Sequence, residues 1–178
     1  MKLIAQPLTV AGFAPYGTVI AVADDSAGGR LINNGTTRRF DLIDDMQLSA
    51  DAGRPMLAMF RAEARSFPHA VTELERHALG SQTFVPMGGE RRFVIVVARA
   101  GEAPTTDALA AFVTNGRQGI TLAPGTWHHA LLAIDAGDFV VIERSAATVD
   151  CVVCEVSPKV SVAWAGIGPA TSRRLAIP

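Results

Sequence analysis

The chain has 178 residues, of which 49% are hydrophobic and 19% charged, and its formal net charge is -1. That length suits one domain with a substantial core, and the near-neutral charge gives no electrostatic reason to expect binding to nucleic acid or to an anionic membrane. The longest strongly apolar run, Phe93 to Ala98, is far shorter than the roughly 20 residues of a membrane-spanning helix, so we expect a globular protein that binds a small molecule.

The first half of the chain predicts short strands separated by turn residues. Thr9 can cap a short helical turn that ends near Pro15, and Asn34-Gly35 favours the tight turn of a hairpin. Strands are expected at residues 2–8, 18–22, 31–32, 38–43, 55–62 and 66–77.

The second half continues in the same way. The strongest strand is expected at residues 92–99, and the clearest helical segment is 107–112, which a threonine can cap. Many short strands at a spacing of roughly 8 to 12 residues predict an all-β sandwich or barrel. The pattern fades late in the chain, so we expect a single domain over residues 1–178 with a C-terminal tail at 157–178. The remaining strands are expected at residues 119–122, 127–134, 138–144 and 151–156.

The only two cysteines, Cys151 and Cys154, form a lone Cys-x-x-Cys, which is weak support for zinc or redox chemistry. They lie in a strand-like segment, where their sulfurs would point to opposite faces. We interpret both as small core residues.

Ligand-type side chains are concentrated in residues 74 to 89. Glu75 and His77 are separated by one residue, so both side chains point to the same face of an extended chain. Gln82 follows Gly80-Ser81, which can end one strand and begin its partner. We therefore expect two strands that face one pocket.

Two further histidines, His128 and His129, follow the turn residues Pro124-Gly125 at the start of a strand. Neighbouring residues of a strand point to opposite faces, so only one of the two can face the interior of a barrel.

The spacing of these residues resembles the cupin superfamily. Its first motif has two ligand positions one residue apart, a third a few residues later and then a glycine, and its second motif ends in a turn and a histidine. Glu75, His77, Gln82, Gly89 and His128 occupy these places, although cupins more often have His at the first and Glu at the third. The resemblance implies a cupin-type β-barrel with one or two short helices, and Glu75, His77, Gln82 and His128 as metal ligands.

A closer resemblance, to the ureidoglycolate lyase family, covers almost the whole chain. It implies a usually dimeric cupin that cleaves (S)-ureidoglycolate to glyoxylate and urea in allantoin and purine breakdown, with a divalent metal such as nickel and no organic cofactor. One departure is Ala123, which stands where the family usually has a histidine. The resemblance lies in the segments Ile32-Asn33-Asn34-Gly35, Phe60-Arg61-Ala62, Leu74-Glu75-Arg76-His77, Leu79-Gly80-Ser81-Gln82, Phe84-Val85-Pro86-Met87, Asn115-Gly116-Arg117-Gln118-Gly119, Trp127-His128-His129 and Asp138-Phe139.

Cleavage of this hemiaminal needs a base for the hydroxyl proton and an acid for the departing urea nitrogen. We expect His77 and His128 to serve as acid and base or as metal ligands, with Glu75 as partner or base. A half-buried strand residue bonded to the backbone is the alternative interpretation of His77.

Substrate binding needs a carboxylate clamp and groups for the urea end. We expect Arg61, ahead of Arg76 or Arg92, to hold the carboxylate. Gln82 and the amides of Asn33 and Asn34 suit the remaining polar groups, although Asn34 is equally a turn former and Arg61 equally a surface residue.

Other functions, assembly and location are also expected from the sequence. The alternatives to a lyase are a non-enzymatic cupin that binds or senses a small carboxylate, and a related cupin lyase or isomerase with a changed substrate. A barrel with short exposed strands would gain by pairing edges in a homodimer. The segment Met1 to Pro7 reaches a proline before a signal-like stretch develops, so we expect a cytoplasmic location.

Overall fold

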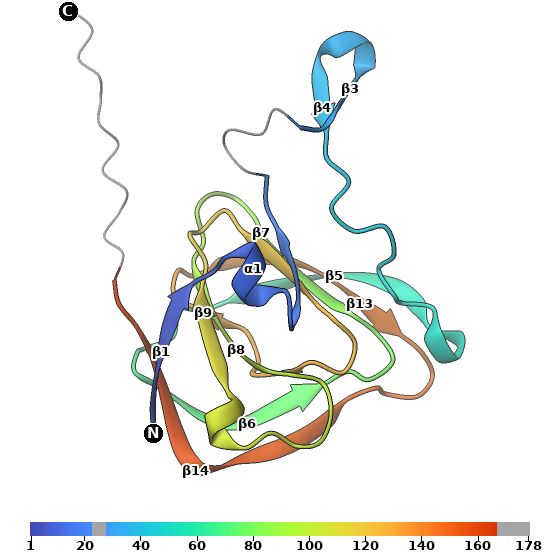
Figure 1. Ribbon diagram of the computed structural model, residues 1–178. Helices are drawn as coiled ribbons and strands as arrows, with labels where there is room; N and C mark the ends of the chain where they lie inside the picture. Colours follow the sequence, from blue (N-terminus) through green and yellow to red (C-terminus); the bar gives the residue numbers. More distant parts are fainter. Residues whose placement is uncertain (23–27, 167–178) are drawn as a thin grey trace, which may run out of the picture.

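The computed structural model describes residues 1–22 and 28–166 of the chain. Strands from both ends of this range form a closed barrel (Figure 1). The strands follow the order β11-β6-β14-β1-β9-β8, and the ring closes because β8 also pairs with β11. The prediction of a mainly-β barrel is confirmed. The barrel strands are β1 (Lys2–Pro7), β6 (His69–Arg76), β8 (Phe93–Ala98), β9 (Ala110–Val113), β11 (Trp127–His128) and β14 (Val152–Trp164), with β12 (Leu132–Ala133) at the edge of β8.

A second, five-stranded antiparallel sheet has the order β2-β10-β7-β13-β5. A separate hairpin of β3 (Arg30–Ile32) and β4 (Thr37–Arg39) stands away from the barrel (Figure 1). The second sheet consists of β2 (Gly17–Ile20), β5 (Arg54–Ala62), β7 (Gln82–Pro86), β10 (Gly119–Leu122) and β13 (Gly137–Ser145), and the helical elements are α1 (Val10–Phe13), η1 (Asn33–Gly35), η2 (Ala50–Ala52) and η3 (Thr106–Ala108).

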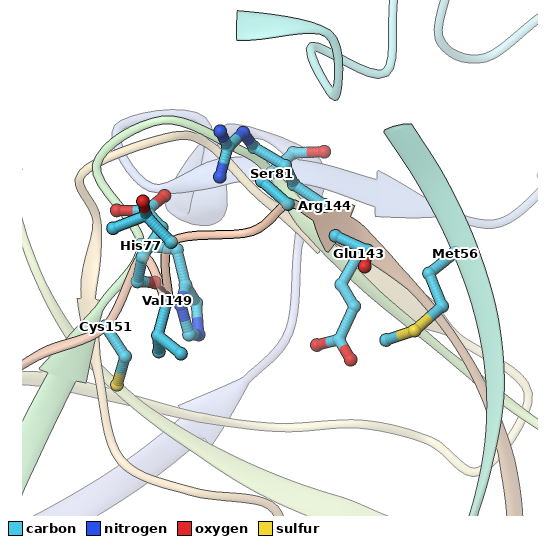
Figure 2. A pocket seen from close by; sticks show the side chains of 11 residues that line it. Met56, His77, Ser81, Glu143, Arg144, Val149 and Cys151 are labelled. Atoms are coloured by element: carbon cyan, nitrogen blue, oxygen red, sulfur yellow. Dashed lines mark hydrogen bonds between the residues drawn. The ribbon is translucent and has the colours of Figure 1, made fainter. Parts of the chain in front are cut away.

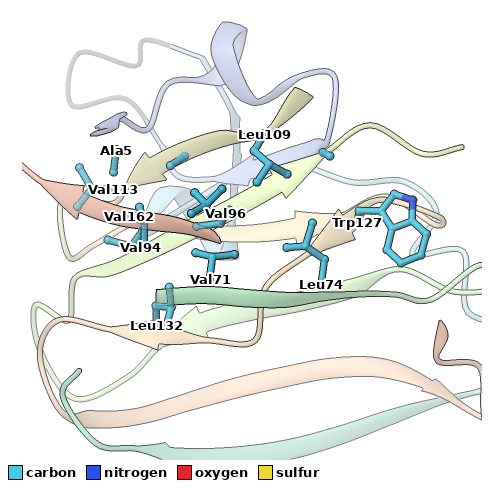
Figure 3. Close-up of a cluster of buried hydrophobic side chains, with 13 residues drawn as sticks. Ala5, Val71, Leu74, Val94, Val96, Leu109, Val113, Trp127, Leu132 and Val162 are labelled. Atoms are coloured by element: carbon cyan, nitrogen blue, oxygen red, sulfur yellow. The ribbon is translucent and has the colours of Figure 1, made fainter. Parts of the chain in front are cut away.

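Strand β8 is buried on both faces, which explains why it is the longest apolar run in the sequence. Val94, Val96 and Ala98 belong to one hydrophobic cluster, with Leu74 and Trp127 (Figure 3). The alternate residues of β8 belong to a second cluster. That cluster also contains residues from β7, β9, β10 and β13, namely Phe84, Phe112, Ile120, Phe139 and Val141. Because its alternate side chains enter different clusters, β8 connects the two. Each buried side chain of this size contributes roughly 1.5–3 kcal/mol to stability.

Two local predictions are confirmed. Oγ1 of Thr9 accepts a hydrogen bond from the backbone N–H of Gly12 at 3.1 Å and caps helix α1. The hairpin turn lies at Asn34-Gly35, where φ is 54° and 86°, a left-handed conformation that Asn and Gly tolerate.

The helix predicted at residues 107–112 is wrong. A single 3-10 turn, Thr106–Ala108, is followed by strand β9. Strand β9 pairs with β8 on one side and with β1 on the other, and its last three residues are buried. Tertiary pairing therefore overrides the helical preference of the alanines and the leucine.

The predicted start of the C-terminal tail at 157 is also wrong, because strand β14 continues to Trp164 and pairs with β6 and β1. Val160 and Val162 alternate into the core, which fixes this part of the strand. The rest of the predicted tail, 167–178, lies outside the described residues. No helix among the described residues is long and apolar enough to cross a membrane.

Strands β6 and β7 are not partners, contrary to expectation. Strand β6 belongs to the barrel sheet, whereas β7 pairs with β10 and β13 in the five-stranded sheet. The Gly80-Ser81 segment therefore carries the chain from one sheet to the other.

Candidate active site

The structure brings Glu75, His77 and His128 together at one end of the barrel. Glu75 on β6 and His128 on β11 are direct cross-strand partners, and His77 is the first residue after β6. One ligand atom from each of the three side chains lies within 4.8 Å of the other two. The two imidazole rings are 5.3 Å apart between centroids, so the predicted grouping of these three residues matches the geometry.

Backbone carbonyls orient both rings. Nδ1 of His77 lies 2.5 Å from the carbonyl oxygen of Asp150, and Nδ1 of His128 lies 3.0 Å from that of Thr126. A carbonyl oxygen only accepts, so each Nδ1 carries a proton, and in the neutral ring Nε2 is the nitrogen with the lone pair. Both Nε2 atoms are buried without a hydrogen-bond partner among the described residues.

Glu75 supplies a negative charge beside these nitrogens. Its Oε1 lies 3.5 Å from Nε2 of His128, a contact that is an ion pair only when that nitrogen is protonated. Interaction with His128 lowers the pKa of the Glu75 carboxyl, and burial opposes this effect only in part. The carboxylate is therefore ionised at neutral pH and can act as a base or a metal ligand.

Of the three residues, His77 lines a pocket of about 250 Å³. Figure 2 shows His77 and Glu143 on opposite sides of this pocket, with Cys151 beside His77 and Met56 beside Glu143. Ser81 and Arg144 lie along the rim that connects them. The lining residues are Met56, His77, Ser81, Glu143, Arg144, Ser145, Ala146, Thr148, Val149, Asp150 and Cys151.

Gln82, the other predicted ligand, lies on β7 in the second sheet. Its side chain is buried, and Nε2 donates a hydrogen bond of 2.9 Å to Oε2 of Glu143. Gln82 therefore contacts Glu143, whose carboxylate lines the pocket opposite His77.

The arginines predicted to clamp a carboxylate lie in other surroundings. Arg61 is on β5, where its side chain is 84% exposed and forms an ion pair of 2.8 Å with Asp138. Along β13, Asp138 lies five positions before Glu143, which corresponds to roughly 17 Å of extended strand. Arg76 stacks on Trp127 and bonds the carbonyl of Gly101, and Arg92 pairs with Asp135.

Asn33 and Asn34, predicted for the urea end, lie in the turn of the exposed β3–β4 hairpin. Nδ2 of Asn33 donates to Oγ1 of Thr37 at 3.3 Å, a contact within the hairpin. The turn-forming interpretation of Asn34 describes what the structure shows.

Sequence reasoning missed Asp150, Cys151 and Glu143. The carboxylate of Asp150 accepts hydrogen bonds from the backbone N–H groups of Ala78 and Leu79, at 2.9 and 2.6 Å. Sγ of Cys151 lies 3.7 Å from Oε2 of Glu75. Burial, and then the charge of Glu75, raises the pKa of this thiol, so it stays protonated and can donate to the carboxylate.

The interpretation of the cysteines as core residues holds for one of them. Cys154 packs against the first hydrophobic cluster, whereas Cys151 is exposed at the pocket. Cys151 reaches the site because β14 pairs with β6, with Val153 opposite Glu75. Sequence spacing alone does not reveal that register, so no local signal identifies Cys151 as a site residue.

The cluster fits a divalent metal ion. Two buried imidazole nitrogens with available lone pairs and one ionised carboxylate converge. Imidazole and carboxylate together suit borderline ions such as zinc, nickel, iron and manganese. The carbonyl groups that hold both Nδ1 atoms are the outer partners expected of metal-binding histidines.

The chain matches known proteins over most of its length. A model of the ureidoglycolate lyase family matches residues 1–163. The chain is 45% identical over 151 residues to a ureidoglycolate lyase of Pseudomonas syringae pv. syringae, an alignment that covers 84% of this chain and 87% of the relative. It is also 45% identical to one of Burkholderia cepacia, over 84% of this chain and 83% of the relative, and 43% identical to one of Azotobacter vinelandii, over 85% and 90%. The chain therefore belongs to the ureidoglycolate lyase family.

Proposed function

We propose that this chain cleaves (S)-ureidoglycolate to glyoxylate and urea in the breakdown of allantoin and purines. The observation that carries the proposal is the convergence of Glu75, His77 and His128 beside a pocket, in a chain of this family. In the reaction the hydroxyl loses its proton, the C–O bond becomes a carbonyl, and the C–N bond breaks. The nitrogen of the departing urea takes the electron pair and one proton.

Glu75 and the two histidines are suited to move that proton. The Glu75 carboxyl, whose pKa is lowered, is ionised at neutral pH, so it is free to accept the hydroxyl proton. Nε2 of His128, 3.5 Å from Oε1, is placed to receive the proton and return it to the urea nitrogen. The proton that leaves the hydroxyl thus ends on urea, and no redox cofactor takes part.

As the alternative to this proton transfer, we propose that the same three residues hold a divalent metal, with nickel as the first candidate, in which case Nε2 of His128 is a ligand and does not carry the proton. The ligand atoms would be Nε2 of His77, Nε2 of His128 and a carboxylate oxygen of Glu75. A metal at this position supplies Lewis-acid polarisation of the hydroxyl or carboxylate oxygen of the substrate. Gln82 remains a further proposed ligand, although its amide nitrogen is engaged with Glu143.

The decisive experiment is incubation of the purified protein with racemic ureidoglycolate, with glyoxylate and urea both assayed, with and without added nickel or manganese. We expect the two products in equal amounts and consumption of half of the racemate. If the products form no faster than in the spontaneous reaction, both with and without each added metal, the lyase proposal is wrong. That result would favour instead a cupin that binds a small carboxylate, which the names of the relatives do not support.

We propose a homodimer in which the outer face of β5 contacts a second copy. In the described sheet β5 is an edge strand that pairs with β13 alone, and it exposes Leu57 and Met59. Sedimentation should give a dimer for the natural chain and a monomer for Leu57→Glu. An unchanged dimer in that variant would move the interface elsewhere. A cytoplasmic location stays a prediction.

A further inference from the structure

A second carboxylate faces the cluster from across the pocket, and the proton transfer proposed above does not use it. Glu143 lies on β13 and lines the pocket together with His77. The two side chains stand on opposite sides of it (Figure 2). A substrate that fills this pocket with its reacting carbon near His77 can therefore reach Glu143.

Gln82 fixes the position of this carboxylate. Its Nε2 donates to Oε2 of Glu143 at 2.9 Å, and the Gln82 side chain is buried against neighbours on both sides of β7. Because a carboxylate only accepts, this bond also sets the orientation of the amide, with Oε1 turned away from Glu143. Oε1 is buried with no hydrogen-bond partner among the described residues, so the bond from Nε2 to Glu143 is the polar contact that holds this amide.

We propose that Glu143, positioned by Gln82, binds the ureido end of the substrate. A ureido group presents two parallel N–H bonds on the side opposite its carbonyl oxygen, and the two oxygens of one carboxylate match that pair, as they match the fork of a guanidinium group. This inference rests on the proposed ureidoglycolate cleavage and adds the group that recognises the leaving urea. It gives Glu143 the role that the sequence suggested for Asn33 and Asn34.

The chemistry of urea determines which kinetic constant should respond. Urea, like the substrate, offers two parallel N–H bonds, so Glu143 binds the ureido group equally before and after the C–N bond breaks. Interactions of equal strength in the ground state and the transition state change KM and leave kcat nearly constant. Glyoxylate has no N–H, so its binding does not depend on Glu143.

Two uncleavable ligands isolate the proposed contact in a titration calorimetry experiment. N-carbamoylglycine is the substrate without its hydroxyl and keeps both N–H groups, whereas succinamate replaces the inner N–H by a methylene. We expect the natural chain to bind N-carbamoylglycine about 10- to 100-fold more tightly than succinamate, the usual effect of a hydrogen bond to a charged group. Glu143→Gln should bind the two ligands with nearly equal affinity.

Kinetic assays give a second readout. Glu143→Gln should raise KM by about 10- to 100-fold, change kcat by less than about threefold, and weaken inhibition by urea but not by glyoxylate. Glu143→Asp, which keeps the charge, should be intermediate. The matched control is Asp138→Asn, which removes an exposed carboxylate of the same strand and should match the natural chain in every measurement.

Failure of this inference and failure of the proposed function give different results. A natural chain that cleaves ureidoglycolate while Glu143→Gln keeps the ligand preference, or loses only kcat, would overturn the ureido site alone. A natural chain that prefers N-carbamoylglycine through Glu143 but releases no glyoxylate would support the ureido site and overturn the lyase proposal. Binding of neither ligand and no turnover would overturn both.

Discussion

Glu75 and His128 lie directly opposite each other on β6 and β11, so the strand pairing that connects these two barrel strands also sets the distance between their side chains. Oε1 of Glu75 and Nε2 of His128 are 3.5 Å apart as a result. A slip of one residue in either strand would turn one of the two side chains to the opposite face. The acid-base pair therefore depends on the register of β6 and β11.

Removal of either histidine of the cluster should abolish turnover without unfolding the barrel. We expect His77→Ala and His128→Ala each to lower kcat/KM by about 10²- to 10⁴-fold, the usual contribution of a positioned acid or base. His129→Ala is the matched control, because the ring of His129 contacts His69 and not the cluster. Circular dichroism should report unchanged strand content. Near-normal turnover in either cluster variant would place the reaction elsewhere.

Asp150 should matter for stability, because its carboxylate holds the turn that follows His77. Asp150→Ala removes two hydrogen bonds to a carboxylate, and we expect the free energy of unfolding to fall by about 1–3 kcal/mol. Asp150→Asn keeps one acceptor oxygen and should lie between. Unfolding is best followed in guanidinium chloride, since urea is a proposed product. Equal stability of all three chains would show that the carboxylate does not hold this turn.

The ion pair of Asp135 and Arg92 should make stability depend on pH. Two hydrogen bonds of 2.9 and 3.0 Å from the Arg92 guanidinium lower the pKa of the Asp135 carboxyl from its ordinary 3.8, and burial opposes this only in part. A carboxyl whose pKa is lower in the folded state stabilises the protein above its unfolded pKa, and this contribution is lost as the pH falls through the folded pKa.

Asp135→Asn should therefore lower the free energy of unfolding by about 1–2 kcal/mol at pH 7, and the difference from the natural chain should shrink as the pH falls below 3.8. Denaturation curves at pH 7, 5 and 3 test this. Asp41→Asn, in an exposed pair with Arg39, should show little difference at any pH. A difference of the same size at pH 7 and pH 3 would contradict the assignment.

Metal binding should depend on the three converging side chains. Calorimetric titration with nickel should show one site in the natural chain, and His77→Ala should weaken the affinity at least about tenfold. Gln82→Leu distinguishes the fourth predicted ligand, since its amide contacts Glu143. Affinity that is unchanged in Gln82→Leu would remove Gln82 from the ligand set, and affinity that is unchanged in His77→Ala would remove the metal site itself.

Arg61→Ala should leave KM for ureidoglycolate unchanged within about twofold, since the exposed pair that Arg61 forms with Asp138 contributes roughly 0–1 kcal/mol and lies away from the pocket. Steady-state kinetics of this variant beside Asp138→Ala provide the measurement. A large rise in KM for Arg61→Ala alone would show that the arginine reaches the substrate.

The sequence predicted the strands and part of the site because these depend on local patterns. The alternation that puts Glu75 and His77 on one face, and the turn that precedes His128, are both visible in a few consecutive residues. The same local view produced the wrong helix at residues 107–112, where pairing with β8 and β1 outweighs the propensity of an Ala-rich segment.

By itself the sequence determined the β-rich character, the family and three side chains of the site, since periodicity and motif spacing survive without knowledge of the fold. Only the tertiary structure decided which distant groups surround them. Pairing of β14 with β6 brings Asp150 and Cys151 to Glu75 and His77. Pairing of β13 with β7 joins Glu143 to Gln82. Strand register between segments that are 61 to 76 residues apart follows from how the whole core packs, and no local pattern encodes it.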